Sequence, residues 1–251
     1  MNTLEVLRSR KFSTRFSVES QDFSAAGICP RSTSDGKEPG DSGWLRVGKD
    51  DTGSMKIAFL GDSLTFGYGV PRKKNWVSLV GERLGAETLN FGVTGDTTAG
   101  LSVRLHTQVI PALPDIVCVM GGYNDILACG NSDGARSNMM GLICRAQAAG
   151  LIPVLGIPTQ IISAEAKPEW AELFDFPGTE AARDAYAEWL RRFAKTFQVH
   201  TIDFAGELPK RMQANPAVGY LDGLHLNRAG HQAMAEIFEE GIRPLLETLE
   251  L

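Results

Sequence analysis

From Met55 to the C-terminus, short apolar runs alternate with longer amphipathic stretches, and this alternation constrains the fold more than any other feature of the chain. The predicted strands are Lys56–Leu60, Thr88–Val93, Asp115–Met120, Leu151–Ile157 and Val199–Phe204. Apolar residues at helical spacing predict helices over Trp76–Leu84, Leu101–Leu113, Asn138–Ala149, Glu180–Phe197 and Arg228–Leu249. Strands that alternate with helices form βαβ units, so we expect a mostly parallel sheet that is covered by helices on both faces.

Five strands joined by right-handed crossovers leave few topologies. We expect the flavodoxin-like, doubly wound order, that is, an α/β fold with a three-layer α/β/α sandwich around a five-stranded, mostly parallel sheet. A long polar loop with Pro158, Pro168, Trp170 and Pro177 should follow the fourth strand, and a second loop should lead from the fifth strand to the last helix. Functional groups of such sheets gather beyond the carboxyl ends of the strands.

Residues 1–54 differ in character from the rest of the chain. They lack long apolar periodicity, and the stretch STSDGKEPGDSG (Ser32–Gly43) has the composition of a flexible segment. We therefore expect a largely disordered extension or leader over 1–54 and a folded domain over 55–251. A natural extension, an added leader and upstream sequence translated from a misplaced start, with Met55 as the native start, all remain open.

The composition excludes several classes of protein. The chain has 251 residues, 25 Lys and Arg against 30 Asp and Glu, and a net charge of −5, which argues against a nucleic-acid-binding surface. No apolar run approaches the length of a membrane-spanning helix, so stable membrane insertion is not expected. Without a secretory signal, and with too few cysteines for a disulfide scaffold, a cytoplasmic location is the default expectation. Cys118, inside an apolar run, is expected to be a buried free thiol.

Polar residues stand at the ends of four predicted elements. The first strand runs into Gly61-Asp62-Ser63-Leu64-Thr65, the second into Gly92-Val93-Thr94-Gly95-Asp96-Thr97, and the third into Gly121-Gly122-Tyr123-Asn124-Asp125; Leu221-Asp222-Gly223-Leu224-His225 follows the fifth. Together these blocks contain a serine, a backbone-exposing glycine, an asparagine and an Asp/His pair. These are the parts that acyl transfer requires: a nucleophile, a base with its orienting group, and oxyanion donors.

Each block taken alone also has a structural interpretation. Gly61-Asp62-Ser63 could be a plain turn between strand and helix. Gly95-Asp96-Thr97-Thr98 and Asn124-Asp125 could cap helices, and Asn227 could cap the last one. It is the occurrence of all four blocks at successive ends of one sheet that favours a catalytic site.

The four blocks resemble those of the GDSL or SGNH hydrolases, a family of serine esterases and lipases with a flavodoxin-like fold. The GDSL block is intact at Gly61–Leu64, Gly95 matches the glycine of the second block, Gly122-Tyr123-Asn124-Asp125 matches G-x-N-D, and Asp222-Gly223-Leu224-His225 matches D-x-x-H. The resemblance runs from about Met55 to the C-terminus and leaves residues 1–54 uncovered. Within the family, the Thr94–Thr97 block is similar to that of bacterial arylesterases and of thioesterase/lysophospholipase members.

Physical roles and resemblance assign the same residues. Ser63 is the predicted nucleophile, His225 its base, and Asp222 the group that orients the imidazole. The predicted oxyanion donors are the N–H groups of Ser63 and Gly95 and the side-chain amide of Asn124. A glycine at position 95 would let the substrate approach the backbone closely. No cofactor and no metal are expected, because no Cys, His or carboxylate cluster has metal-ligand spacing.

Other residues receive weaker predictions. Leu64, Tyr123, Ile126 and Leu224 flank the predicted site and could form an acyl pocket, although they could equally belong to the core. Trp170, Phe174 and Phe176 in the long loop could form a lid or a dimer contact, which leaves a homo-oligomer open. His106 and His200 are expected to be structural, and His231 is the competing candidate for the base.

The leading functional hypothesis is a cofactor-free serine esterase that cleaves small or acyl esters or thioesters through an acyl-enzyme. A carbohydrate O-acetyl esterase of the same fold is the alternative within the class. A non-catalytic binding module that retains the fold is the alternative from another class, and the complete set of nucleophile, base and oxyanion donors argues against it.

Overall fold

The computed structural model describes residues 54–249, so the prediction made for residues 1–54 lies, apart from Ser54, outside the described residues. Within the described part, one sheet is formed by β1 (Lys56–Gly61), β2 (Glu87–Gly92), β3 (Ile116–Met120), β4 (Ile152–Ile157) and β5 (His200–Asp203). The strand order is β2-β1-β3-β4-β5, and each neighbouring pair is parallel. This is the flavodoxin-like doubly wound order, and the predicted fold class is confirmed.

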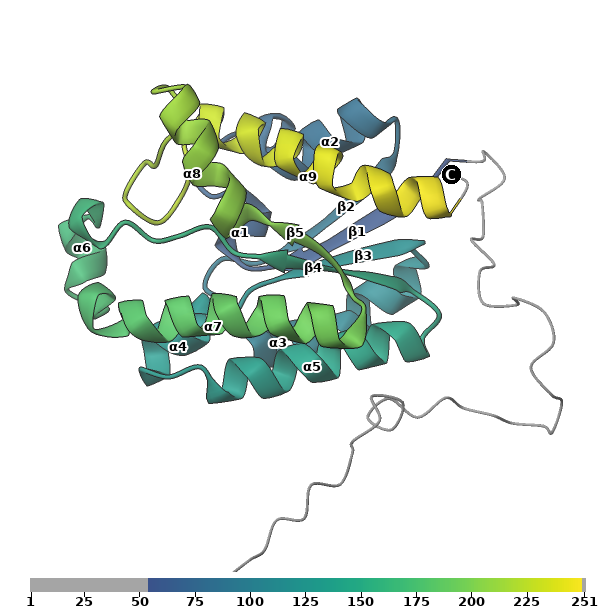
Figure 1. Cartoon of the computed structure of the whole chain (residues 1–251), viewed down its shortest axis with the longest axis horizontal. Helices are drawn as coiled ribbons and strands as arrows, with labels where there is room; N and C mark the ends of the chain where they lie inside the picture. The colour runs from purple at the N-terminus through teal and green to yellow at the C-terminus, as the bar shows by residue number, and fades with distance from the viewer. Residues whose placement is uncertain (1–53, 250–251) are drawn as a thin grey trace, which may run out of the picture. The chain divides into compact units, whose positions relative to one another are not determined.

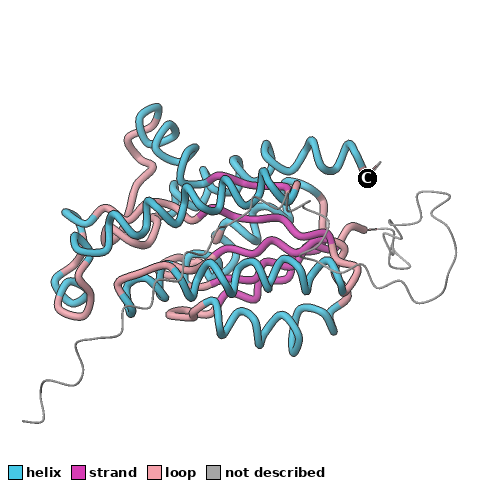
Figure 2. Tube along the Cα trace, turned by 60° about the horizontal axis from the view of Figure 1, so that its bottom comes forward, coloured by secondary structure: helices cyan, strands magenta, loops and turns pink. Residues whose placement is uncertain are grey.

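Helices cover both faces of this sheet, as Figures 1 and 2 show. One face carries α2 (Trp76–Leu84), α8 (Phe204–Ala214) and α9 (Arg228–Thr248), and α9 packs against both of the others. The opposite face carries α3 (Thr98–Arg104), α4 (Tyr123–Cys129), α5 (Asp133–Ala148) and α7 (Phe176–Phe197). No helix within residues 54–249 is both long and apolar enough to cross a membrane.

The central strands of the sheet bury side chains on both faces, which explains why their sequences are apolar without interruption. Ala58 and Leu60 of β1 belong to the core cluster on the side of α3, α5 and α7, whereas Ile57 and Phe59 belong to the cluster on the side of α2 and α9. Successive side chains of a strand point to opposite faces, so a strand covered on both sides must be apolar at every position. Cys118 of β3 lies in the second cluster as a buried free cysteine, as predicted.

The second loop, expected between the fifth strand and the last helix, is shorter than predicted. α8 occupies residues 204–214, so the loop is confined to 215–227. Asp203 begins this helix: its side chain accepts a hydrogen bond from the N–H of Gly206 at 2.9 Å. Phe204, Ala205 and Leu208 bury one face of the helix against the sheet layer. Pro209 lies inside the helix, although proline usually ends a helix.

Three other helices begin earlier than predicted. α5, expected from Asn138, begins at Asp133. α7 begins at Phe176 because Asp175 accepts the N–H of Gly178 at 2.8 Å and Pro177 occupies the first turn, where its missing N–H costs nothing. The helix expected from Leu101 begins at Thr98 and continues after Arg104 as a π-helical turn over Leu105–Val109 and a 3₁₀ turn over Ile110–Ala112.

The long polar loop after β4 contains a 3₁₀ turn at Ser163–Glu165 and the short helix α6 (Pro168–Ala171). Figure 1 places α6 at the same end of the sheet as α1 (Ser63–Phe66), which follows β1 directly. This is the end at which the strands present their carboxyl termini, and it therefore carries the predicted site.

Candidate active site

The register of the sheet brings the strand ends together. Gly61 at the end of β1 pairs with Gly92 of β2 on one side and with Met120 of β3 on the other. The residues that follow each strand therefore leave the sheet at the same level. This places the GDSL block between the turn that contains Gly95 and the start of α4, which contains Asn124.

Ser63 is the first residue of α1. Asp62 precedes it and accepts the N–H of Leu64 at 3.0 Å, which caps the helix. Trp76 donates its indole N–H to the carbonyl of Leu64 at 2.8 Å and ties this turn to α2. Gly92 is required for the close packing of β2 here, because a Cβ at that position would lie 2.1 Å from the backbone nitrogen of Phe66.

The side chains of Ser63, His225 and Asp222 form a continuous hydrogen-bonded chain. His225 Nε2 lies 3.0 Å from Ser63 Oγ, and His225 Nδ1 lies 2.9 Å from Asp222 Oδ2. All three side chains are buried. The structure thus brings together the three residues that the sequence predicted as nucleophile, base and orienting group.

The loop that carries Asp222 and His225 is held by its own backbone. Asp222 Oδ1 accepts the N–H groups of Leu224 at 3.1 Å and His225 at 2.7 Å, and the N–H of Leu221 is donated to the carbonyl of His225 at 2.7 Å. Burial by itself raises the pKa of Asp222. The hydrogen bonds and charge of His225, together with the N–H of Leu224, outweigh burial, so the pKa of this carboxyl lies below its usual range.

The predicted oxyanion residues lie on two adjoining blocks. Asn124 donates a side-chain N–H to the carbonyl of Asp96 at 2.8 Å, which joins the start of α4 to the turn that contains Gly95. Gly95 has a φ of +76°, and no atom lies within 4 Å of where its Cβ would be. Its left-handed backbone conformation is therefore the local reason for glycine at this position.

Some of the capping interpretations also hold. Thr97 caps α3, and Asn227 caps α9 by accepting the N–H of Gly230 at 2.8 Å. Asp125 caps α3 from outside the helix: its carboxylate accepts the N–H of Thr98 at 2.9 Å and the hydroxyl of Thr98 at 2.6 Å. Thr97 and Asp125 therefore have a structural role as helix caps, next to Gly95 and Asn124, which are the predicted oxyanion residues.

Sequence reasoning missed an arginine that joins the strand ends. Arg104 of α3 forms an ion pair with Asp96 and donates to the carbonyl of Gly61 at 2.9 Å and to the carbonyl of Phe91. One side chain thus links the end of β1, the end of β2 and the turn that follows β2. An arginine at the last position of a helix carries no sequence signal for such a role.

Asp62, beside Ser63, is only 3% exposed. Burial raises its pKa to about 7, the N–H of Leu64 acts in the opposite direction, and the nearby carboxylates of Asp96 and Asp125 add to the rise. The acidic residue of the GDSL block therefore serves the backbone of α1 and has no contact with His225 among the described hydrogen bonds.

Two aromatic residues surround the imidazole of His225, and sequence reasoning did not assign them to the site. The ring of Tyr68 lies 4.3 Å from the imidazole, centroid to centroid, and that of Trp170 lies 5.9 Å from it. Trp170 Nε1 also donates to Asp222 Oδ2 at 3.2 Å. Trp170, which was predicted as a lid or a dimer contact, therefore lies against the Asp/His pair.

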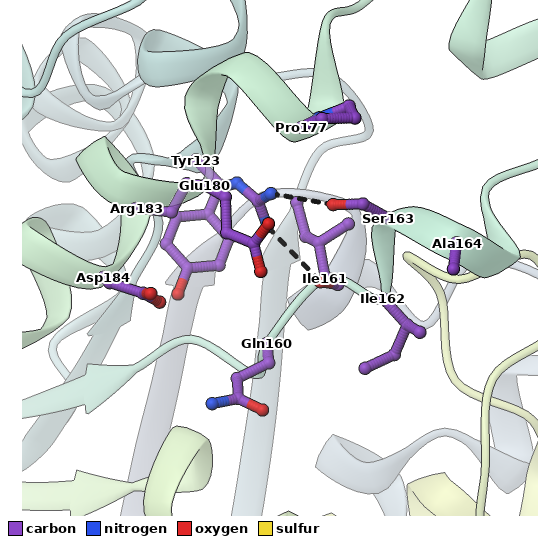
Figure 3. Close-up of a pocket in the computed structure, with 10 residues that line it drawn as sticks. All are labelled: Tyr123, Gln160, Ile161, Ile162, Ser163, Ala164, Pro177, Glu180, Arg183 and Asp184. Atoms are coloured by element: carbon purple, nitrogen blue, oxygen red, sulfur yellow. Dashed lines mark hydrogen bonds between the residues drawn. The ribbon is translucent and has the colours of Figure 1, made fainter.

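Two of the four residues predicted for an acyl pocket pack in the core. Leu64 is 5% exposed and belongs to one core cluster, and Ile126 is fully buried in the other. Leu224 is half-buried. Tyr123 lines a cavity of about 540 Å³ between α7 and the loop after β4, in which the guanidinium of Arg183 donates to Ser163 and to the carbonyl of Ile161 (Figure 3).

The other histidines do not contact Ser63. His106 is exposed on the π-helical turn, and His200 of β5 bonds through Nε2 to the carbonyl of Gly241 at 2.7 Å. His231 is buried in α9, and its Nδ1 accepts the N–H of Trp76 at 3.4 Å. Across residues 54–249, no group of three His, Cys or carboxylate side chains is arranged to hold a metal ion.

Comparison with known proteins shows the family of this chain and agrees with its fold. The sequence matches the model of the GDSL-like lipase/acylhydrolase family over residues 59–233. An arylesterase of Vibrio mimicus is 36% identical over 77 residues, which make up 29% of this chain and 38% of that protein. The esterase TesA of Pseudomonas aeruginosa is 27% identical over 201 residues, 77% of this chain and 90% of that protein.

A solved structure of the same family has a similar fold. A member of the lipolytic G-D-S-L family from Veillonella parvula is similar with a TM-score of 0.64 at 25% identity, covering 74% of this chain and 97% of that one. The chain belongs to the GDSL-like lipase/acylhydrolase family, and the predicted resemblance is confirmed. The name of this family describes lipases and acylhydrolases, which are enzymes that hydrolyse ester bonds.

Proposed function

We propose that this protein is a cofactor-free serine esterase that cleaves carboxylic ester or thioester bonds through an acyl-enzyme, with Ser63 as the nucleophile. The observation that carries the proposal is the hydrogen-bonded chain from Ser63 Oγ through the imidazole of His225 to Asp222 Oδ2, at 3.0 and 2.9 Å. A serine hydroxyl is a weak nucleophile unless a base accepts its proton as it attacks.

The geometry assigns each step to an atom. His225 donates its Nδ1–H to Asp222, which leaves Nε2 unprotonated and facing Ser63 Oγ. As Oγ attacks the carbonyl carbon, its proton passes to Nε2, and the Asp222 carboxylate stabilises the imidazolium that forms. The tetrahedral intermediate then collapses: the bond to the leaving group breaks, and that group takes the proton from Nε2. Water repeats the sequence on the acyl-enzyme and releases the acid.

The negative charge on the carbonyl oxygen needs fixed donors. The N–H of Ser63, at the N-terminus of α1, the N–H of Gly95 and the side-chain amide of Asn124 supply them in this proposal. An amide NH₂ has two N–H groups, and the carbonyl of Asp96 takes one of Asn124. That bond orients the amide, and the second N–H is assigned to the oxyanion.

Apolar side chains near the site support esters of apolar acids or alcohols as the substrates. Large hydrophobic residues usually avoid water, yet Phe66, Tyr68, Val93 and Leu221 are between 37 and 44% exposed. All four follow β1 or β2 or immediately precede Asp222, so they lie in the segments that carry the candidate site. The relative from Vibrio mimicus is an arylesterase, which agrees with this class of substrate.

Labelling with a fluorophosphonate probe, followed by peptide mass spectrometry, tests the nucleophile. We expect modification at Ser63 in the wild-type chain and none in Ser63→Ala. Ser163→Ala is the matched control, because Ser163 lines the cavity of Figure 3 and should leave labelling unchanged. A folded wild-type protein that the probe does not modify would favour the non-catalytic binding module.

A substrate series then tests the finer class. It contains p-nitrophenyl esters from acetyl to octanoyl, the matching acyl-CoA thioesters, and acetylated xylose. We expect kcat/KM to be highest for the p-nitrophenyl esters and to increase from acetyl to a longer acyl group. A preference for acetylated xylose over every other substrate would instead identify a carbohydrate O-acetyl esterase.

A further inference from the structure

We propose that Trp170 is a positioning residue for the reaction and that it acts on His225 through Asp222. This inference rests on the proposed function, since it assigns a role within the same site. Trp170 lies on α6, in the loop between β4 and α7. Nothing in the four sequence blocks points to it.

The hydrogen bonds of Asp222 show why an outside donor matters. Oδ1 accepts two N–H groups from the loop of Asp222 itself, those of Leu224 and His225. Oδ2 accepts His225 Nδ1 at 2.9 Å and Trp170 Nε1 at 3.2 Å. Among the described hydrogen bonds of Asp222, the bond from Trp170 is therefore the one that comes from another part of the chain. It fixes the oxygen on which the imidazole is aligned.

The loop that carries Trp170 packs directly on the loop that carries His225. The N–H of Ile162 donates to the carbonyl of Gly223 at 2.7 Å. A Cβ at Gly223 would lie 2.6 Å from the carbonyl oxygen of Ile162 and 2.7 Å from the nitrogen of Ala166. The two loops are thus in backbone contact, so the position of the indole is coupled to that of Asp222.

The indole also limits how the imidazole can move. Tyr68 and Trp170 lie 4.3 and 5.9 Å from the imidazole centroid and 6.4 Å from each other. The imidazole can therefore tilt little without contacting a ring. Because alignment errors of about 1 Å can cost on the order of 10²-fold in rate, one additional bond to the orienting carboxylate can be measured kinetically.

Trp170→Phe tests the proposal, because it keeps an aromatic ring beside His225 and removes the N–H donor. With a p-nitrophenyl ester, we expect kcat to fall by about fivefold to thirtyfold while KM changes by less than about twofold. Trp189→Phe is the matched control: Trp189 lies on α7, stacks on Tyr186 and Phe193, and should leave both constants unchanged.

A double-mutant cycle with Asp222→Asn shows whether Trp170 acts through Asp222. We expect Trp170→Phe to have less than about a twofold effect in the Asp222→Asn background, since the orienting interaction is already lost there. An equal loss in both backgrounds, or a loss expressed in KM alone, would overturn the proposal and make Trp170 a wall of the substrate site.

The test separates this inference from the proposed function. If the wild-type chain lacks turnover that depends on Ser63, the proposed function fails. If that turnover is present and Trp170→Phe retains the wild-type kcat, the inference alone fails. Thermal melts verify that each variant is folded, and Trp170→Leu, which also lacks the donor, replaces the Phe variant if that variant does not fold.

Discussion

The regions around His225 and His231 contain the same side chain at nearly the same depth but in different surroundings. Each residue is 2% exposed, one on the loop before α9 and the other in the first turns of that helix. His225 has a carboxylate on one ring nitrogen and a serine hydroxyl on the other. His231 accepts the backbone N–H of Trp76 and forms no ion pair among the described residues.

The consequence is a difference in what each imidazole can do with a proton. Burial, with a smaller contribution from the charge of His225, lowers the pKa of His231 to about 4, so this residue stays neutral in the folded protein. In the proposed mechanism, the carboxylate of Asp222 stabilises the positive charge that forms on His225. His231 is thus kept neutral mainly by burial, whereas His225 has the carboxylate and hydroxyl contacts that the proposed mechanism requires.

The largest expected effect is on kcat, and it differs between variants that lack His225 and variants that lack His231. Ser63→Ala and His225→Ala should each lower kcat for a small ester by about 10⁵-fold or more, because the two residues act as a unit. His231→Gln should keep kcat close to wild type. Steady-state assays of the three purified variants make the comparison, and an inactive His231→Gln beside an active His225→Ala would reverse our assignment of the base.

Asp222→Asn removes the feature that distinguishes the two regions most directly. We expect kcat to fall on the order of 10³- to 10⁴-fold, since an amide favours the wrong imidazole tautomer and cannot stabilise the imidazolium. Asp203→Asn is the control, because Asp203 caps α8 and pairs with Arg191. A kcat for Asp222→Asn within about tenfold of wild type would show that His225 does not depend on this carboxylate.

The pH profile of the rate addresses the protonation state of the base. On the acid side, kcat/KM should fall about tenfold for each pH unit once His225 is protonated, because only the neutral imidazole accepts the serine proton. The pKa of Asp222 is held below its usual range, so this carboxylate stays charged over the assay range. His231→Gln should keep the same profile. A flat profile between about pH 5 and 8, with chemistry rate-limiting, is incompatible with a histidine base.

The smallest expected effect is on stability and belongs to His231. Between about pH 6.5 and 4, the unfolded chain binds a proton at this residue that the folded protein does not, so the free energy of unfolding rises with pH in this window. The contribution is absent above pH 6.5 and reaches about 3 kcal/mol of destabilisation near pH 4.

Urea melts of the wild type and His231→Gln at pH 7, 5.5 and 4 measure this contribution. The variant should lose less stability than the wild type as the pH falls. His106→Gln, at an exposed histidine, is the matched control and should follow the wild type. If the free energy of unfolding changed with pH in the same way for the wild type and His231→Gln, His231 would bind its proton equally in the folded and the unfolded protein.

Local patterns predicted most of the fold. The apolar runs located all five strands within one residue at each end. β3 and β4 are apolar at every position because helices cover both faces of the sheet, whereas β2 and β5 include polar residues. α8 was missed because Pro209 argues against a helix locally, and only burial of Phe204 and Leu208 against the sheet layer outweighs this. The N-terminal part of α7 was missed for a similar reason. Proline is common in loops, so Pro177 was assigned to the loop, whereas the structure has it in the first turn of the helix.

For the site, the sequence by itself determined the residue types at the strand ends: Ser63, Gly95, Asn124 and the Asp222/His225 pair. Their blocks are local, so each can be recognised without a structure. Tertiary structure alone decided which buried histidine faces Ser63, that Arg104 joins three segments, and that Trp170 reaches Asp222. These contacts link residues far apart in the chain, and their geometry depends on strand register and loop packing, which leave no periodic or local signal in the sequence.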